Sequence, residues 1–82
     1  MQANDIKRFI ETGLPGARAE VKGDDGTHFE AVVVCRAFSG KSLLEQQRMV
    51  YAALGDHMRS DIHALSMRTY TPEQWAATQS GQ

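Results

Sequence analysis

Residues 62–75 read Ile-His-Ala-Leu-Ser-Met-Arg-Thr-Tyr-Thr-Pro-Glu-Gln-Trp, and this stretch predicts a strand that runs directly into a helix. The helix start is indicated by Thr71 as N-cap, Pro72 at the first helical position and Gln74 as the second half of a capping box. Trp75 then supplies a large apolar anchor. These signals indicate a well-defined position for His63 at the start of the strand. On local physics alone, a purely structural corner explains the same residues.

The residues before this stretch predict a helix and a hairpin. Asn4 or Asp5 is the expected cap of the helix, and its apolar residues recur on one side: Ile6, Phe9, Ile10 and Leu14. A half-buried strand over 17–22 and a strand rich in Val and Phe over 27–35 flank the turn at 23–26. We therefore expect the two strands to pair.

A second long helix is predicted over residues 43–54, with Ser42 as its cap and Gly55 at its end. Its apolar residues are expected on one broad face, opposite Glu45 and Arg48: Leu43, Leu44, Val50, Tyr51 and Leu54. Residues 56–60 are expected to form a short helical piece or an irregular turn.

The predicted order of elements is α-β-β-α-(short α)-β-α. About 25 residues, mostly helical, separate the second and third strands, and such crossovers usually join parallel strands. The prediction is an α+β two-layer domain spanning residues 1–82, with a three-stranded mixed sheet, helices on one face and a frayed tail over 78–82.

Composition indicates an ordinary globular chain of 82 residues with 41% hydrophobic residues and a net charge of −1. This charge provides no general attraction to nucleic acid or anionic lipid. The single cysteine excludes an internal disulfide and favours a reducing compartment. There is no apolar run near the ~20 residues of a membrane span, and the first residues lack secretion-signal features. We expect a cytoplasmic protein without a membrane partner.

Two histidines open neighbouring elements of this fold, His28 at the second strand and His63 at the third. If these strands are parallel neighbours, both imidazoles lie at one edge of the sheet and could share a ligand. A closed tetrahedral metal site needs about four ligands, so further donors would have to come from elsewhere, such as a partner chain. From the residues alone, two solvated histidines at a polar edge are the favoured interpretation.

The other reactive residues indicate no catalytic site. Cys35 has the opposite strand parity to His28, so we expect it in the core and unable to share a ligand with that histidine. His57 is expected on the surface at a helix end. Core packing accounts for the methionines Met49, Met58 and Met67. Spacing indicates no set of nucleophile, base and orienting group, so we do not expect an enzyme.

Nucleic-acid binding is the alternative considered from the residues. A helix-turn-helix around Gly55 would have a second helix of only about five residues, which is short for a recognition helix. The order of elements also resembles a KH-like layout, but its only Gly-x-x-Gly spacing, at 23–26, is acidic and would repel phosphate. The remaining basic residues favour a solvated polar face, with a modest basic patch as the alternative: Lys41, Arg48, Arg59 and Arg68.

Two stretches identify a family resemblance. Residues 38–51, Phe-Ser-Gly-Lys-Ser-Leu-Leu-Glu-Gln-Gln-Arg-Met-Val-Tyr, together with residues 62–75, resemble the BolA family. The short chain and the Asp-Gly-Thr-His-Phe loop are most similar to its small IbaG-like, acid-stress subgroup. The resemblance implies a BolA-like fold, similar to the type II KH fold. Many members carry a histidine where this chain has Gln47, so any role of that histidine does not transfer.

The resemblance also implies a function. BolA-like proteins pair with monothiol glutaredoxins of the Cys-Gly-Phe-Ser type, and the heterodimer can hold a bridging [2Fe-2S] cluster. The glutaredoxin and its glutathione provide cysteine ligands, while the family's histidine ligands match His63 and, in the loop before the second strand, His28. Imidazole ligation would raise the cluster potential and make retention pH-sensitive. No cofactor is expected in the isolated chain, for which a weak homodimer stays open. The family alternative is a DNA-binding regulator of the stress response and cell morphology.

Overall fold

The computed structural model describes residues 1–23, 25–60, 62 and 64–80, without the side chains of residues 59 and 60. The elements follow the predicted order, which is confirmed, and a short 3₁₀ turn that we had not expected is added after the second strand. Their bounds are α1 (Ala3–Gly13), β1 (Arg18–Lys22), β2 (His28–Val34), η1 (Arg36–Phe38), α2 (Leu43–Leu54), α3 (His57–Ser60), β3 (Ala64–Tyr70) and α4 (Pro72–Ser80).

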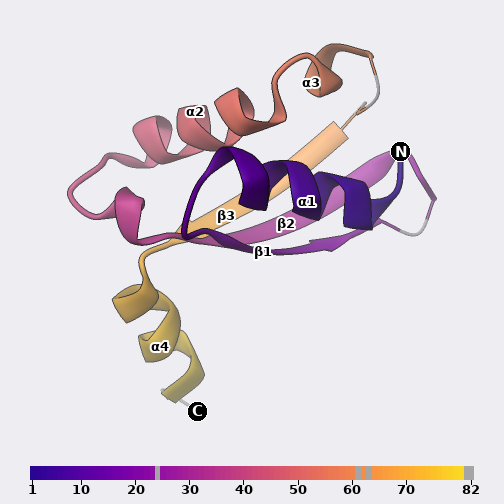
Figure 1. Ribbon diagram of the computed structural model, residues 1–82. Helices are drawn as coiled ribbons and strands as arrows, with labels where there is room; N and C mark the ends of the chain where they lie inside the picture. Colours follow the sequence, from indigo (N-terminus) through magenta and orange to yellow (C-terminus); the bar gives the residue numbers. More distant parts are fainter. Residues whose placement is uncertain (24, 61, 63, 81–82) are drawn as a thin grey trace.

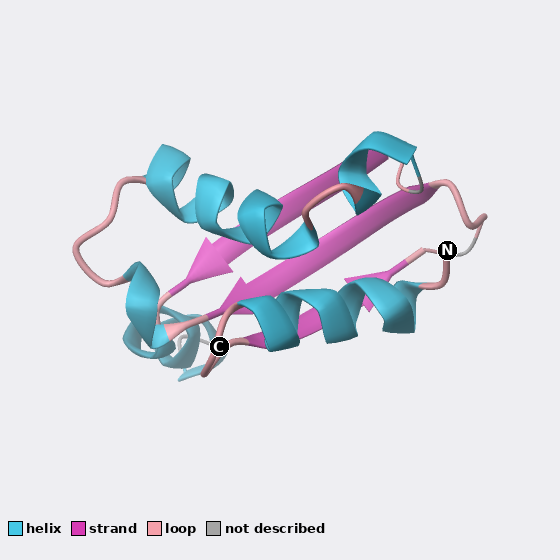
Figure 2. Ribbon diagram, turned by 45° about the horizontal axis from the view of Figure 1, so that its top comes forward, coloured by secondary structure: helices cyan, strands magenta, loops and turns pink. Residues whose placement is uncertain are grey.

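The sheet has β2 in its centre. β1 pairs with β2 antiparallel, and β3 pairs with β2 parallel, so the order is β1-β2-β3. The parallel register runs from His28 opposite Ala64 to Val34 opposite Tyr70. The arrows in Figure 2 show this mixed sheet, with β2 and β3 pointing the same way. The parallel pairing predicted from the long helical crossover is therefore confirmed.

Helices α1 and α2 lie side by side on one face of the sheet (Figures 1 and 2). The strand residues that face them are apolar because the side chains of a strand alternate between its two faces. Along β2 the inward positions are Phe29, Ala31 and Val33, and Cys35 continues the same series, 1% exposed. In the described part of the chain, no long helix covers the centre of the opposite face, which we call the open face (Figure 1).

The first helix begins at Ala3, two or three residues earlier than the predicted cap at Asn4 or Asp5 implies. Its N-cap is Gln2, whose backbone N–H donates to Oδ2 of Asp5 at 3.0 Å. The prediction of Asn4 or Asp5 as the cap was wrong, because the carboxylate of Asp5 reaches backward across the first turn and satisfies the N–H that precedes it. This is the second half of a capping box.

The capping of α2 is confirmed, but part of its predicted apolar face is wrong. Ser42 Oγ accepts from the N–H of Glu45, and the Glu45 carboxylate accepts from the N–H of Ser42. The buried stripe consists of Gln46, Val50 and Leu54 at a spacing of four residues. Leu44 and Tyr51 lie about 100–120° around the helix from Val50, and they are 55% and 41% exposed.

Leu43 was also expected on the buried face, and it is 62% exposed. It occupies the first position of α2, before the first buried residue of the helix, Gln46. The stripe that packs on the sheet is therefore narrower than the sequence indicated.

The methionines agree with the prediction, since Met49, Met58 and Met67 pack partly buried against the core.

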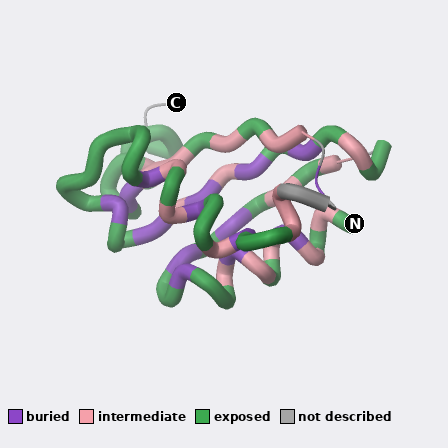
Figure 3. The backbone as a smooth tube through the Cα atoms, turned by 90° about the horizontal axis from the view of Figure 1, so that it is seen from above, coloured by how far each residue is buried: buried purple, intermediate pink, exposed green. Residues whose placement is uncertain are grey.

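The strand-to-helix corner is confirmed. The N–H of Thr71 donates to Gln74 Oε1 at 2.9 Å, and the N–H of Gln74 donates to Thr71 Oγ1 at 3.2 Å. Tyr70 and Trp75 place their ring centroids 5.2 Å apart across the corner. α4 then projects from the sheet and is exposed over most of its length (Figures 1 and 3). It runs to Ser80 and so includes residues 78–80 of the stretch expected to fray.

The outer edge of β1 is closed by α1. Lys7 Nζ donates to the carbonyl of Ala19 at 2.8 Å, and the N–H of Ala19 donates to Glu11 Oε2 at 2.9 Å. Lys7 and Glu11 also pair with each other at 3.0 Å. These side chains occupy backbone groups that an unpaired edge strand would otherwise expose.

Among the helices of the described ranges, none is long and apolar enough to cross a bilayer.

Candidate functional site

His28 lies at the end of the sheet where β2 and β3 both begin. It is the first residue of β2, its register partner is Ala64, and its side chain is 75% exposed. The turn before β2, the start of β3 and the N end of the chain lie at this same end of the sheet (Figure 1). An open depression there is lined by Ala3, Val21, Lys22, Gly23, Asp25, His28 and Glu30. We call this region the histidine edge.

The β1–β2 turn holds His28 through Asp25. Asp25 Oδ1 accepts from the backbone N–H groups of Thr27, at 2.9 Å, and His28, at 2.8 Å. Its Oδ2 lies 2.7 Å from Nδ1 of the His28 ring. The pKa of Asp25 lies well below its usual range. The largest cause is the hydrogen bond from the backbone N–H of His28, followed by the bond to the His28 side chain and then the bond from the N–H of Thr27. Asp25 is therefore a carboxylate at neutral pH.

In the sequence, Asp25 is one of the residues of the predicted turn at 23–26, and no further role was assigned to it. The signal that could have identified its role is the spacing Asp25-Gly-Thr-His28. An aspartate commonly accepts from the backbone N–H two residues later, which folds the chain back on itself. A histidine one position further on then comes within reach of the second carboxylate oxygen.

His63 lies outside the described residues. Its sequence neighbour Ala64 begins β3 directly opposite His28. The topological condition set by the sequence analysis, that β2 and β3 be parallel neighbours, is met. The pairing of the two histidines on one ligand stays a prediction.

The remaining candidate residues, His57 and Cys35, are not among those that line the depression of the histidine edge, although the carbonyl of His57 accepts from the N–H of Ile62 at 2.9 Å, close to the start of β3. His57 begins α3 and stacks on Phe9 of α1, with the ring centroids 4.0 Å apart and the planes at 10°. Cys35 is buried just after the far end of β2, as expected from its parity. Neither residue joins His28.

Within the described part of the chain, no three His, Cys, Asp or Glu residues are close enough to hold a metal ion. What this part supplies at the edge is an exposed imidazole oriented by a carboxylate. Such a pair is a common arrangement for one ligand of a metal centre. The described donors fit a shared centre whose other ligands come from elsewhere, and they do not form a closed site.

The basic residues proposed for nucleic acid lie on different sides of the molecule. Lys41 and Arg48 are exposed, just before and within α2, which covers one face of the sheet. Arg68 lies on the open face, because its neighbour Met67 packs toward the core. Glu20 and Glu30 share with Arg68 a depression on that open face. The side chain of Arg59 lies outside the described residues.

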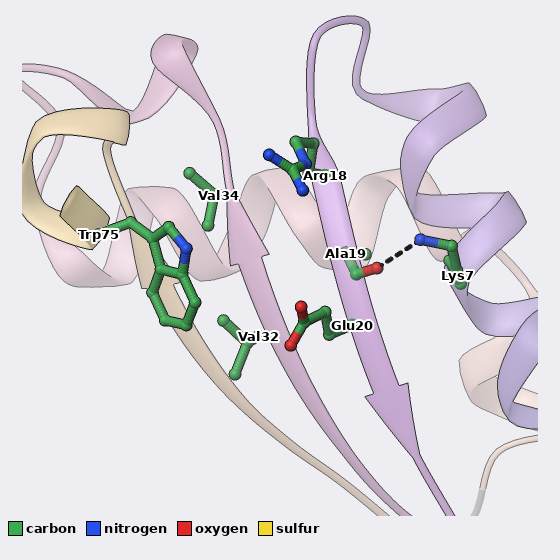
Figure 4. Close-up of a pocket in the computed structure, with 7 residues that line it drawn as sticks. All are labelled: Lys7, Arg18, Ala19, Glu20, Val32, Val34 and Trp75. Atoms are coloured by element: carbon green, nitrogen blue, oxygen red, sulfur yellow. Dashed lines mark hydrogen bonds between the residues drawn. The ribbon is translucent and has the colours of Figure 1, made fainter. Parts of the chain in front are cut away.

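A second, smaller cavity lies toward the other end of the sheet, beside α4. It has a volume of about 90 Å³ and is lined by Lys7, Arg18, Ala19, Glu20, Val32, Val34 and Trp75. Figure 4 shows the Trp75 indole reaching from α4 towards Val32 and Val34, with Arg18 and Glu20 across from them on β1. The cavity lies beside the C-terminal half of β2, so it is separate from the histidine edge at the start of that strand.

The chain belongs to the BolA-like protein family. The family model described as "BolA-like protein" matches residues 13–74, which include β1, β2, α2, α3 and β3. The expectation from the two sequence stretches is confirmed. The class is therefore that of small α+β proteins built on a three-stranded mixed sheet.

Particular relatives extend over most of the chain. The acid stress protein IbaG of Escherichia coli (strain K12) is 35% identical over 77 residues, covering 93% of this chain and 90% of IbaG. The DNA-binding transcriptional regulator BolA of the same strain is 32% identical over 71 residues, 87% of this chain and 68% of BolA. The structure of a bolA protein homologue from Coxiella burnetii superposes with a TM-score of 0.86 at 53% identity, covering 93% of this chain and 97% of that one.

Proposed function

We propose that this protein is a non-enzymatic adaptor that binds a monothiol glutaredoxin and contributes imidazole ligands to a shared [2Fe-2S] cluster. The observation that carries the proposal is the parallel pairing of β2 with β3, which puts His28 opposite the residue that follows His63. Membership of the BolA-like family supports it, because the family resemblance assigns ligand roles to these two positions. In this proposal the cluster is not a permanent cofactor of this chain. The heterodimer holds it for trafficking in the cytoplasm.

The chemistry of the histidine edge supports a partial site. The exposed ring of His28 can approach a centre carried on another protein, whereas a buried ring could not. The partner and its glutathione would supply the thiolates, and this chain would supply neutral nitrogen donors. Imidazole ligation on one iron raises the potential of a [2Fe-2S] centre relative to four thiolates, so the heterodimer would hold the cluster in a more easily reduced form.

The test mixes the protein with a cluster-loaded glutaredoxin of the Cys-Gly-Phe-Ser type and records visible absorption and circular dichroism. We expect a spectrum distinct from that of the glutaredoxin homodimer. His63→Ala and His28→Ala should each abolish the change or accelerate cluster loss. If both variants leave the heterodimer spectrum and its decay unaltered, the ligand assignment is wrong.

The chain provides a matched control in its third histidine. His57→Ala removes an imidazole that stacks on Phe9 and that is neither of the two proposed ligands. We expect it to leave the spectrum of the heterodimer unchanged. Circular dichroism in the far ultraviolet checks that all three variants retain the fold.

A second candidate function is DNA binding, favoured by the 32% identity with a relative named as a DNA-binding transcriptional regulator. If it holds, affinity should fall steeply with salt and on replacement of Arg48. Arg68→Ala is informative here because Arg68 faces the other side of the sheet. If α2 forms the DNA-binding surface, Arg48→Ala should lower the affinity for DNA and Arg68→Ala should change it little. If the protein causes no sequence-preferring mobility shift of DNA at low salt, DNA binding is not its function.

A further inference from the structure

We propose that Asp25 is a positioning residue for His28, holding the proton of the neutral imidazole on Nδ1 and so leaving the lone pair on Nε2 for an incoming metal centre. This inference rests on the proposed function for the metal and on the structure for the tautomer. No role of Asp25 follows from the family resemblance given above.

The carboxylate of Asp25 is itself held in place. Oδ1 accepts two backbone N–H groups, from Thr27 and from His28. The hydroxyl of Thr27 also donates to the backbone carbonyl of Asp25, at 3.2 Å. These bonds fix the turn and orient the carboxylate plane, and Oδ2 is left pointing at the His28 ring. The side chain that orients the imidazole therefore also sets the start of β2.

The short contact to the ring selects one tautomer. Neutral imidazole has one N–H donor and one acceptor nitrogen, whereas a carboxylate only accepts. With Oδ2 at 2.7 Å from Nδ1, the Nδ1–H tautomer forms a hydrogen bond, while the other tautomer would set two lone pairs against each other. The proton therefore resides on Nδ1 of the neutral ring, and Nε2 is the nitrogen able to ligate.

The geometry also restrains the ring. An exposed histidine ordinarily samples several rotamers, and binding would have to select one of them. The bond to Asp25 limits that freedom before any partner arrives. In many metalloproteins a carboxylate binds the histidine that in turn ligates the metal, and Asp25 and His28 would form the same arrangement. Loss of the outer carboxylate typically lowers metal affinity by about 10–100-fold.

Asp25→Asn is the decisive variant because it preserves shape and reverses one hydrogen bond. The amide oxygen can still accept from Thr27 and His28, while the amide nitrogen replaces Oδ2 and donates to Nδ1. The neutral ring must then carry its proton on Nε2, which blocks the proposed ligand atom. Glu30→Gln is the matched control, because it removes a carboxylate from the same depression and leaves the hydrogen bonds between His28 and Asp25 in place.

The first measurement uses the metal-free protein, so that it does not depend on the proposed function. Two-bond ¹H–¹⁵N correlation spectra at about pH 8, where an ordinary imidazole is neutral, report which ring nitrogen carries the proton. We expect the Nδ1–H form in the natural protein and in Glu30→Gln, and the Nε2–H form in Asp25→Asn. A ring that keeps its proton on Nδ1 in Asp25→Asn overturns the positioning role.

The second measurement uses the heterodimer with a cluster-loaded monothiol glutaredoxin. We expect Asp25→Asn to lose the cluster about tenfold or more faster than the natural protein, and Glu30→Gln to match the natural protein. The inference is overturned if Asp25→Asn loses the cluster no faster than the natural protein while His28→Ala loses it faster. If His28→Ala also has no effect while the tautomer inverts as expected, the assignment of His28 as a cluster ligand fails and the control of the tautomer by Asp25 stands.

A further variant guards against misfolding. Asp25→Ser retains a short oxygen for the turn N–H groups but cannot reach the ring, so the two tautomers should coexist. A single Nδ1–H form in this variant would show that Asp25 does not select the proton position.

Discussion

Gln46 is a polar residue inside the core of this small domain, and it is 8% exposed. Its Nε2 donates to the carbonyls of Phe38, at 3.3 Å, and Lys41, at 3.0 Å. Its Oε1 accepts from the hydroxyl of Thr69 at 2.6 Å. One amide thus joins the loop before α2 to β3. A buried polar group is tolerated here because its hydrogen-bonding capacity is used.

We predict that Gln46→Leu lowers the free energy of unfolding by about 1–3 kcal/mol. The leucine fills a similar volume, but it leaves Thr69 and two carbonyls without this partner. Urea denaturation at neutral pH measures the change. Gln47→Leu, one position along the same helix and outside the buried stripe, should change stability by less than about 0.5 kcal/mol. Equal effects of the two substitutions would contradict this account of Gln46.

The carboxylate of Glu11 makes stability depend on pH. The backbone N–H of Ala19, and then Lys7, lower the pKa of Glu11 below its ordinary value. A pKa that is lower in the folded state means that this interaction stabilises the fold above the ordinary pKa, and that the stabilisation is lost as pH falls through the lowered folded value. We expect thermal stability to decrease on acidification below about pH 4.5.

Glu11→Gln tests this dependence. The amide has no charge to lose, so the variant should be less stable than the natural protein at pH 7, and the difference should shrink as the pH is lowered toward 3. Thermal unfolding followed by circular dichroism across this range measures it. A difference that stays constant with pH would show that the charge of Glu11 is not involved.

At the scale of elements, α1 and α2 lie in close contact where α1 ends. A Cβ built on Gly13 would lie 2.7 Å from Cβ and 2.8 Å from Cα of Ala53. Atoms at such distances must move apart, and the neighbour is partly backbone, which cannot rotate away. The helices can lie this near to each other because Gly13 has no side chain.

We predict that Gly13→Ala destabilises the domain. Overpacking costs about 1–3 kcal/mol, and the better helix propensity of alanine offsets up to about 1 kcal/mol of it. The expected net loss is about 1–2 kcal/mol in chemical denaturation. Thr12→Ala is the control in the same turn, at an exposed position, and it should be nearly neutral. Stabilisation by Gly13→Ala would mean that the helices can separate without cost.

At the scale of the whole molecule, the proposed function requires that a partner complete the metal site. Because no cluster of three metal-ligating side chains occurs in the described part of the chain, we predict that the isolated protein does not retain iron. Anaerobic reconstitution with iron and sulfide followed by gel filtration should leave a colourless protein. The same treatment with a monothiol glutaredoxin present should yield a coloured heterodimer. Stoichiometric iron on the isolated chain would contradict the shared site.

Several parts of this fold could be predicted because their signals are local. The capping boxes at Ser42 and Thr71 lie within one turn of helix, and Gly55 ends α2 with a positive φ of 57° that favours glycine. The long helical crossover predicted the parallel pairing of β2 and β3 from chain connectivity alone. From that pairing the possible meeting of His28 and His63 at one edge followed.

Other features could not be predicted because they depend on which surfaces meet. Leu44 is as apolar as the buried Val50 and Leu54, and its exposure, like that of Tyr51, reflects the narrow stripe by which α2 rests on the sheet. The burial of Gln46 depends on carbonyls that are supplied by a loop and on a hydroxyl supplied by β3. The bond from Asp25 to the ring of His28 depends on the path of the turn between two strands.

The sequence by itself determined the order of the elements, the ends of α2 and the start of α4, and the family, since these depend on neighbouring residues and on quoted motifs. Only the tertiary structure decided which side of α2 is buried, that Arg68 faces away from Arg48, and that Asp25 orients His28. These are contacts between segments brought together by packing, and residue type alone does not specify their distances. The histidine edge combines both kinds of information, with its residues chosen by sequence and its geometry by the fold.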